Sequence, residues 1–187
     1  NKVRNADLAA NATDWVVTSG TATRTTSTTL GDLPAYMRAT GANNLIALNN
    51  QDKIRFNPGT RINVSFAARA DIVNTTGGGV NARRAYVRFT YYNAAGGGVT
   101  TIDASDASKT AAYGEPSGCG TAWETHRIFS DPPTNAASVK IELFPVLGST
   151  GAGKFIDVAQ PVVGVAQAGA DRTVDMLRTN LISDKAT

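Results

Sequence analysis

Residues 61–69 read RINVSFAAR, and apolar and polar side chains alternate along most of this stretch. Successive side chains of an extended strand point to opposite faces, so one face would be apolar and the other polar. The two sets are Ile62, Val64, Phe66 and Ala68 against Asn63, Ser65 and Arg69. This pattern predicts a strand with one face in a core and the other toward water, as in antiparallel sheets.

Two further segments repeat the alternation. Residues 86–92 read YVRFTYY, and residues 139–144 read VKIELF. In the first segment Val87, Phe89 and Tyr91 share one face, which leaves Tyr86, Arg88, Thr90 and Tyr92 on the wetter face. Aromatic side chains therefore lie among charged ones on the wetter faces, with Phe144 in the second segment as another example.

Short strand-like segments continue along most of the chain, separated by Gly, Asn, Asp and Pro. The spacing predicts strands at 15–18, 35–38, 45–48, 53–56, 61–70, 84–92, 123–129, 138–144 and 154–159. No helical period appears before the C-terminal end, so the predicted fold class is all-β. The spacing is typical of an antiparallel all-β sandwich or barrel.

The composition shifts after Pro161, and this shift places the domain boundary. Residues 1–163 are predicted to form the sandwich, and residues 164–187 a linker and tail with a short helix at 171–184. Asp171 is a suitable N-cap, and Val174, Leu177 and Leu181 fall on one helical face. An apolar stripe this short cannot stabilise an isolated helix in water. It packs on the sandwich, or it meets a partner chain or another domain.

Charge and cysteine usage exclude several classes of function. The formal net charge is only +3, and the basic residues are scattered. Nucleic-acid binding normally needs clustered cations, so it is not expected. No apolar run approaches the roughly 20 residues that span a bilayer, so membrane insertion is not expected either. The single cysteine, Cys119, excludes an internal disulfide and a cysteine-based zinc site.

No catalytic residues are predicted, and the chain is not expected to be an enzyme. Residues 148–154, GSTGAGK, match a phosphate-binding loop, but Phe155 replaces the required Ser or Thr and a strand-like segment follows. His126 is the one histidine, and no G-x-S-x-G motif accompanies it, so it is expected on a strand surface. Asp103 and Asp106 are close in sequence and are expected to cap turns rather than to hydrolyse glycosides.

The aromatic residues offer a different chemistry. A sugar ring has an apolar C–H face that stacks on Tyr or Trp, and hydroxyls that bind charged or amide groups. Tyr86, Arg88 and Tyr92 provide both on one strand face, so they are the candidate carbohydrate-binding residues. The alternative is that these tyrosines are ordinary strand residues covered by a loop. Trp15 and Trp123 are expected to be core or sheet-edge anchors.

The order of several short motifs resembles a known family over about residues 3–163. RNADL (4–8) before TDW (13–15) is similar to an opening N-x-D-F-E and G-W, and VRFTYYNAAG (87–96) to a strand ending in Y-x-x-x-G. Further matches are PGTRINVSFAAR (58–69), GTAW (120–123), PP (132–133), ASVKI (137–141) and FIDV (155–158). The chain thus resembles the jelly-roll carbohydrate-binding modules of xylanases and glucanases, and related modules in bacteriophage tail fibres and tailspikes. The resemblance implies a two-sheet antiparallel β-sandwich of the jelly-roll type.

The resemblance implies a structural Ca²⁺ held between the first and last strands. Asp7 and Asp157 occupy the matching places, and oxygen ligands suit this ion. Leu8 and Ala9 stand where the family often has an acidic residue, and a buried or turn-capping Asp157 is the alternative.

The resemblance also implies a function. We expect a non-catalytic carbohydrate-binding module of a larger extracellular or phage tail protein, with a polysaccharide or cell-surface glycan as partner. The alternative is a structural module of a trimeric virion fibre, assembled through the C-terminal tail and without sugar binding. Either places the protein outside the cell or on a virion.

Overall fold

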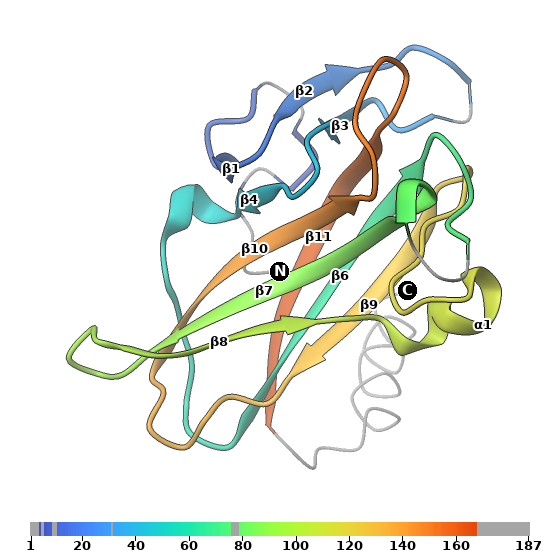
Figure 1. Ribbon diagram of the computed structural model, residues 1–187. Coiled ribbons are helices and arrows are strands. Elements are labelled where there is room, and N and C mark those ends of the chain that lie inside the picture. The colour runs from blue at the N-terminus through green and yellow to red at the C-terminus, as the bar shows by residue number, and fades with distance from the viewer. Residues whose placement is uncertain (1–3, 5, 9–10, 31, 76–78, 168–187) are drawn as a thin grey trace, which may run out of the picture.

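Two antiparallel sheets pack face to face in the computed structural model, which describes residues 4, 6–8, 11–30, 32–75 and 79–167 (Figure 1). This is the predicted β-sandwich. The six-stranded sheet has the order β1-β4-β10-β7-β8, with β5 paired to the start of β10. Its strands are β1 (Val16–Ser19), β4 (Leu45–Ala47), β5 (Ile54–Arg55), β7 (Arg83–Tyr92), β8 (Gly98–Ala104) and β10 (Ser138–Leu147).

The five-stranded sheet has the order β2-β3-β11-β6-β9 and lies behind the other in Figure 1. Its strands are β2 (Ala22–Thr26), β3 (Ala35–Ala39), β6 (Thr60–Ala70), β9 (Glu124–Ser130) and β11 (Ile156–Gln167). The helices are short: η1 (Asn49–Gln51), η2 (Gly79–Asn81), η3 (Ala107–Lys109) and α1 (Thr110–Tyr113). None of the helices in the described ranges is long and apolar enough to cross a membrane.

The alternation seen in the sequence decides which faces form the core. Burial alternates residue by residue along β6 and β7, with the apolar positions inside. Phe66 of β6 and Phe89 of β7 are almost fully buried, and each contributes about 2 to 3 kcal/mol through the area removed from water. The remaining side chains of β7 point outward, away from the core.

Two edge strands, β2 and β8, were not predicted from the sequence. Their sequences, ATRTT and GVTTIDA, are rich in threonine and lack a run of alternating apolar residues. Both strands lie at the edge of their sheet, and their side chains are mostly exposed or half-buried. An edge strand packs less of its surface, so its sequence carries a weaker alternation.

The last strand is longer than the sequence predicted. β11 begins at Ile156 and continues to Gln167, whereas the sequence predicted a strand at 154–159. Pro161 lies within this strand, where the register to β6 shifts between Ala159 and Val162. A bulge of this kind accommodates a proline that cannot donate to the ladder. The predicted helix at 171–184 lies outside the described residues.

Residues 148–155 connect β10 of one sheet to β11 of the other, and a strand follows them rather than a helix. The connection is therefore not a phosphate-binding loop. Gly148 is needed for close packing here, since a Cβ atom at this position would collide with the carbonyl oxygen of Gly79.

Candidate functional site

The outward side of the six-stranded sheet gathers the predicted carbohydrate-binding residues. Tyr86, Arg88 and Tyr92 are half-buried and alternate with core residues along β7, so they share this surface. Strand register adds outward residues from β8 and β10. We call this surface the candidate face, defined by Tyr86, Arg88, Thr90, Tyr92, Asp103, Lys140, Glu142 and Phe144.

Arg88 lies at the centre of the candidate face. Its Nε and Nη2 donate to the two carboxylate oxygens of Asp103 on β8, at 2.6 and 2.8 Å. Its guanidinium carbon lies 4.8 Å from the ring centroid of Phe144. The hydrogen bonds that Arg88 donates to Asp103 raise the pKa of Arg88 above its already high value. The group is thus a permanent cation whose plane is fixed by a two-point contact.

Glu142 pairs with Arg88 across the β7–β10 ladder and is only 2% exposed. A carboxylate so little exposed needs polar partners, and it has them. Thr18 donates its hydroxyl to Glu142 at 2.6 Å, and the Lys140 ammonium lies 3.2 Å away. The sequence did not single out Glu142, although the alternation in residues 139–144 placed it on this face beside Phe144.

The two tyrosines of the candidate face have different surroundings. Tyr86 lies 6.1 Å from Phe144 between ring centroids, and Arg84 donates to its hydroxyl at 3.2 Å. The ring of Tyr92 is covered by the Lys53 ammonium, 3.6 Å from the ring centroid. Tyr92 is thus covered from the segment just before β5, as in the alternative to a sugar-binding role. Tyr86 and Phe144 form the aromatic pair of the candidate face.

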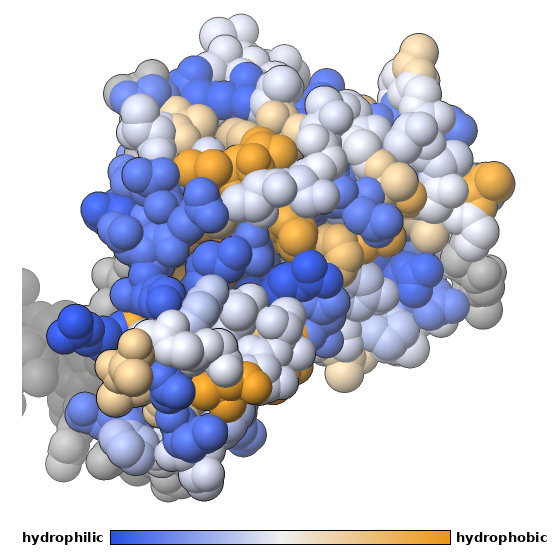
Figure 2. Space-filling view, turned by 60° about the vertical axis from the view of Figure 1, so that its left-hand side comes forward, coloured by the Kyte–Doolittle hydropathy of each residue, from blue (hydrophilic) through white to orange (hydrophobic). Residues whose placement is uncertain are grey.

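A cleft of about 660 Å³ lies at the Tyr92 end of the candidate face. Its walls are the segment around η1 and β5, the turn between β7 and β8, and the start of β10. The lining residues are Gln51, Asp52, Lys53, Arg55, Asn93, Ala94, Ala95, Gly96, Ala137 and Ser138. Figure 2 shows that hydrophobic residues on this side of the molecule form small patches separated by hydrophilic ones. The cleft suits a hydroxyl-rich or charged ligand.

Asp103 and Asp106 are close in sequence but have different roles in the structure. Asp103 belongs to β8 and binds Arg88, so its predicted role in capping a turn is wrong. Asp106 is nearly buried and caps η3, since it accepts from the backbone N–H of Ser108. The prediction of a turn-capping role is therefore confirmed for Asp106.

His126 and Cys119, whose residue types often act as base and nucleophile in enzymes, both lie inside the core. His126 faces inward from β9 and stacks on Phe66, so the prediction of a strand-surface histidine is wrong. Burial lowers the pKa of His126 to about 4 and raises the pKa of the Cys119 thiol to about 12. Both groups are therefore uncharged at neutral pH and out of reach of a substrate.

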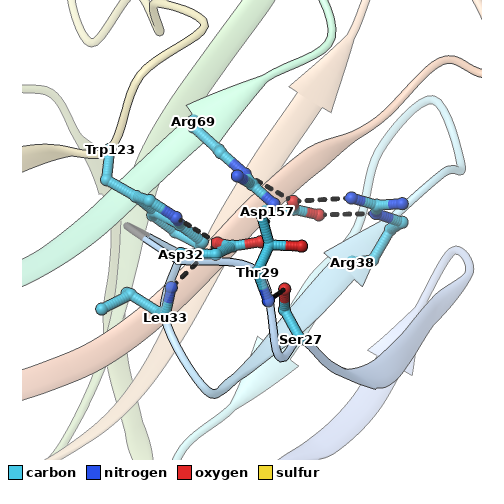
Figure 3. Close-up of polar contacts among 8 residues, drawn as sticks. All are labelled: Ser27, Thr29, Asp32, Leu33, Arg38, Arg69, Trp123 and Asp157. Carbon is cyan, nitrogen blue, oxygen red and sulfur yellow. Dashed lines mark hydrogen bonds and ion pairs between the residues drawn. The ribbon is translucent and has the colours of Figure 1, made fainter.

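Asp157 lies on the outward side of the five-stranded sheet, between two arginines (Figure 3). Arg38 of β3 donates to both carboxylate oxygens, at 2.8 and 2.9 Å, and Arg69 of β6 donates to one at 2.9 Å. Arg69 also reaches Asp32, which accepts from the indole N–H of Trp123 at 2.6 Å. We call this group the arginine–aspartate cluster. Trp123 stacks against Arg69, in agreement with an anchoring role.

This geometry does not fit the calcium site that the family resemblance implied. Both oxygens of Asp157 are bound by guanidinium groups, and a divalent cation there would face two positive charges. Asp157 is fully buried, whereas Asp7 is exposed. Over the described residues, no group of three or more His, Cys, Asp or Glu side chains is placed to hold a metal ion. Asp157 instead matches the alternative of a buried aspartate.

Comparison with known proteins rests on structure alone. No protein-family model matches the chain, and no curated protein does so either. Among solved structures, Family 16 Carbohydrate Binding Module-2 is similar, with a TM-score of 0.55, 10% identity and coverage of 88% of this chain and 99% of that chain. The xylan-binding CBM22-1 domain of Paenibacillus barcinonensis Xyn10C is also similar, with a TM-score of 0.52 and 9% identity. That match covers 83% of this chain and 87% of the xylan-binding domain.

The chain has the jelly-roll fold of carbohydrate-binding modules. The enzymatically active domain of bacteriophage CBA120 tailspike protein 4 is also similar, with a TM-score of 0.54 and 16% identity. That match covers 88% of this chain but only 21% of the tailspike chain. Identities between 9% and 16% make these likenesses ones of fold. The expected resemblance to carbohydrate-binding modules and to a tailspike domain is confirmed at this level.

Proposed function

We propose that this chain is a non-catalytic glycan-binding module and that the candidate face is its binding surface. The observation that carries the proposal is the arrangement around Arg88, where fixed charges and an aromatic pair share one outward sheet surface. Tyr86 and Phe144 would contact the C–H face of a sugar ring. The paired charges of Arg88, Asp103 and Glu142 would bind its hydroxyl groups.

Preorganisation supports this assignment. Arg88 is held along one edge of its guanidinium group by Asp103, and Glu142 is held by Thr18 and Lys140. Side chains that are already fixed lose little rotamer freedom when a ligand binds, so more of the contact energy appears as affinity. The fold adds support, because the similar xylan-binding domain is a binding module by name.

The absence of catalysis is part of the same proposal. His126 and Cys119 are buried in the core. The two carboxylates of the candidate face are each engaged by a cation, Asp103 by Arg88 and Glu142 by Lys140. Glycoside hydrolysis needs one carboxyl group to give its proton to the scissile bond while a second acts from the other side. The paired groups are better suited to holding hydroxyls.

The test is binding to a panel of soluble plant and bacterial polysaccharides, measured by isothermal titration calorimetry. We expect at least one polysaccharide to bind, and Arg88→Ala to weaken its binding about tenfold or more, as for loss of a charge-assisted two-point contact. Arg127→Ala is the matched control, because Arg127 is an exposed arginine on the outward side of the five-stranded sheet. Full affinity in a folded Arg88→Ala variant would remove the candidate face from the proposal.

The likeness to part of a tailspike favours a second proposal. Here the chain is an assembly module of a trimeric virion fibre, located on a virion or outside the cell, and does not bind sugar. The tail proposed to join the subunits lies mainly outside the described residues. Light scattering of the full chain separates the proposals, since a trimer that binds no polysaccharide supports the second and a glycan-binding monomer opposes it.

A further inference from the structure

The cleft at the Tyr92 end of the candidate face carries a charge pattern that the proposed function does not use. Arg55 of β5 and Tyr92 of β7 both pair with Ser138 of β10, so the three residues form a row across neighbouring strands. Lys53 comes two residues before Arg55 and reaches over the Tyr92 ring. Both cations are exposed and line the cleft.

These cations are not neutralised by the chain itself. The one acidic residue in the cleft wall, Asp52, accepts from Arg4 at 2.7 Å, and this arginine is not part of the lining. Within the described part of the chain, no carboxylate lies within ion-pair distance of Lys53 or Arg55. By contrast, the other cations of the candidate face, Arg88 and Lys140, each have a carboxylate partner.

The contact between Lys53 and Tyr92 takes the place of an ion pair. An exposed cation–π contact is weak, and a carboxylate or sulfate that contacted Arg55 as well would bind the Lys53 ammonium more strongly than the ring does. An incoming anion would therefore draw Lys53 away from the ring. The face of Tyr92 would then be uncovered beside the anion, where the ring of the same sugar residue could stack on it.

We propose that this cleft binds an acidic sugar residue of the glycan, with Lys53 and Arg55 holding the anionic group and Tyr92 contacting the ring. The inference rests on the proposed function and names its ligand class: a polysaccharide with carboxylate or sulfate groups. Tyr92 and Arg88 are four residues apart on β7, a distance of about 13 Å along a strand. One polysaccharide chain that extends along β7 would reach both the cleft and the Arg88 region.

Calorimetry with three probes tests the proposal: polygalacturonate, dextran sulfate and neutral xylan. We expect wild type to bind one of the acidic polymers at least tenfold more tightly than xylan at low salt, and this preference to weaken as NaCl screens the charges. A preference for polygalacturonate assigns a carboxylate to the cleft, and a preference for dextran sulfate assigns a sulfate.

Substitutions in the cleft test whether Lys53 and Arg55 cause the preference for the acidic polymer. Lys53→Ala with Arg55→Ala is expected to reduce binding of the acidic polymer about tenfold or more and to leave any binding of xylan unchanged. Arg127→Ala is the matched control and is expected to change neither. An equal loss with Arg127→Ala would indicate nonspecific attraction to positive charge and would overturn the proposal.

The outcomes also distinguish this inference from the proposed function. Binding of xylan with no preference for an acidic polymer overturns the acidic cleft and leaves the glycan-binding proposal intact. The acidic cleft is also overturned if an acidic polymer binds with an affinity that Arg88→Ala lowers but that Lys53→Ala with Arg55→Ala leaves unchanged. The glycan-binding proposal again stays intact. If no polysaccharide binds to folded wild-type protein, both proposals fail.

Discussion

The outward sides of both sheets carry an aspartate paired with arginine, but the two aspartates differ in how deeply they are buried. On the five-stranded sheet, Asp157 is fully buried between Arg38 and Arg69, whose side chains are 31% and 19% exposed. On the six-stranded sheet, the side chains of Arg88 and Asp103 are 28% and 40% exposed. Aromatic rings stack on the arginines of both surfaces.

Burial of the carboxylate decides what each surface does. A buried aspartate between two arginines links three neighbouring strands and depends on both partners, so it supports the fold. An exposed pair contributes little to stability because water and salt screen it, yet its polar atoms remain accessible to a ligand. We therefore assign the arginine–aspartate cluster to stability and the candidate face to binding.

The sharpest test of this difference removes the buried charge. Asp157→Asn leaves two guanidinium groups facing an uncharged side chain, and we expect the free energy of unfolding to fall by roughly 4 kcal/mol. Chemical denaturation measures this change. Asp131→Asn is the control, since it breaks the exposed Arg61–Asp131 pair and should change the free energy of unfolding very little. Similar small losses in both variants would mean that Asp157 is not a structural anchor.

The pH dependence of stability gives the second largest effect. His126 has a native pKa of about 4 and an ordinary value near 6.5, so between these pH values the unfolded chain binds a proton that the native protein does not. This contribution, about 3 kcal/mol, is complete above pH 6.5 and is lost as the pH falls to about 4.

Denaturation at a series of pH values checks this, with His126→Phe as the control that removes the slope between pH 6.5 and 4. Aspartates with lowered pKa values, such as Asp106, add their own loss only below their ordinary pKa of 3.8. Arg88 keeps its charge across the whole range, so glycan binding by the folded protein is not expected to follow the His126 titration. A flat stability profile would contradict the buried, uncharged histidine.

The exposed pair predicts a smaller effect on stability. Arg88→Ala is expected to lower the free energy of unfolding by at most about 1 kcal/mol, because the pair with Asp103 is partly solvated. Thermal melting of the variant, set beside its affinity for polysaccharide, tests whether binding and stability separate on this face. A loss as large as that of Asp157→Asn would make Arg88 a structural residue instead.

The smallest expected effect concerns calcium. Because Arg38 and Arg69 occupy the oxygens of Asp157, we expect the melting temperature to be the same with excess CaCl₂ and with EDTA. A ligand that binds only the native state raises stability with the logarithm of its concentration over Kd, so a real site would be visible as an upward shift. Such a shift, lost in Asp7→Asn, would restore the site implied by the family resemblance.

The sequence predicted the strands whose two faces differ most. β6, β7 and β10 have a core face and a wet face, so their period of two is visible without any tertiary information. β2 and β8 were missed because edge strands need no continuous apolar face. β11 was predicted too short because Pro161 normally ends a strand, and only the bulge, a tertiary feature, accommodates it.

The candidate face was predictable only along a single strand. Tyr86, Arg88 and Tyr92 are separated by even numbers of residues, and this spacing alone places them on the same face of a strand. Their partners depend on strand register: Asp103 and Glu142 meet Arg88 across neighbouring strands, and Lys53 reaches Tyr92 from a distant segment. Register is fixed by the packing of whole sheets, so local sequence patterns do not contain it.

The bulge in β11 interrupts a strand that is otherwise paired along its length. Ile156 to Val158 are hydrogen-bonded to β3 on one side and to β6 on the other, and Val162 to Gln167 continue the pairing with β6 beyond the bulge. Amide hydrogens of Ile156 to Val158 lie inside two ladders and should exchange with solvent only when the domain unfolds globally. The amide of Gln160, an exposed residue at the bulge, should exchange through local opening, at a rate set by a lower free energy. Pro161 thus lies beside a point of low local stability within a strand that crosses the whole sheet.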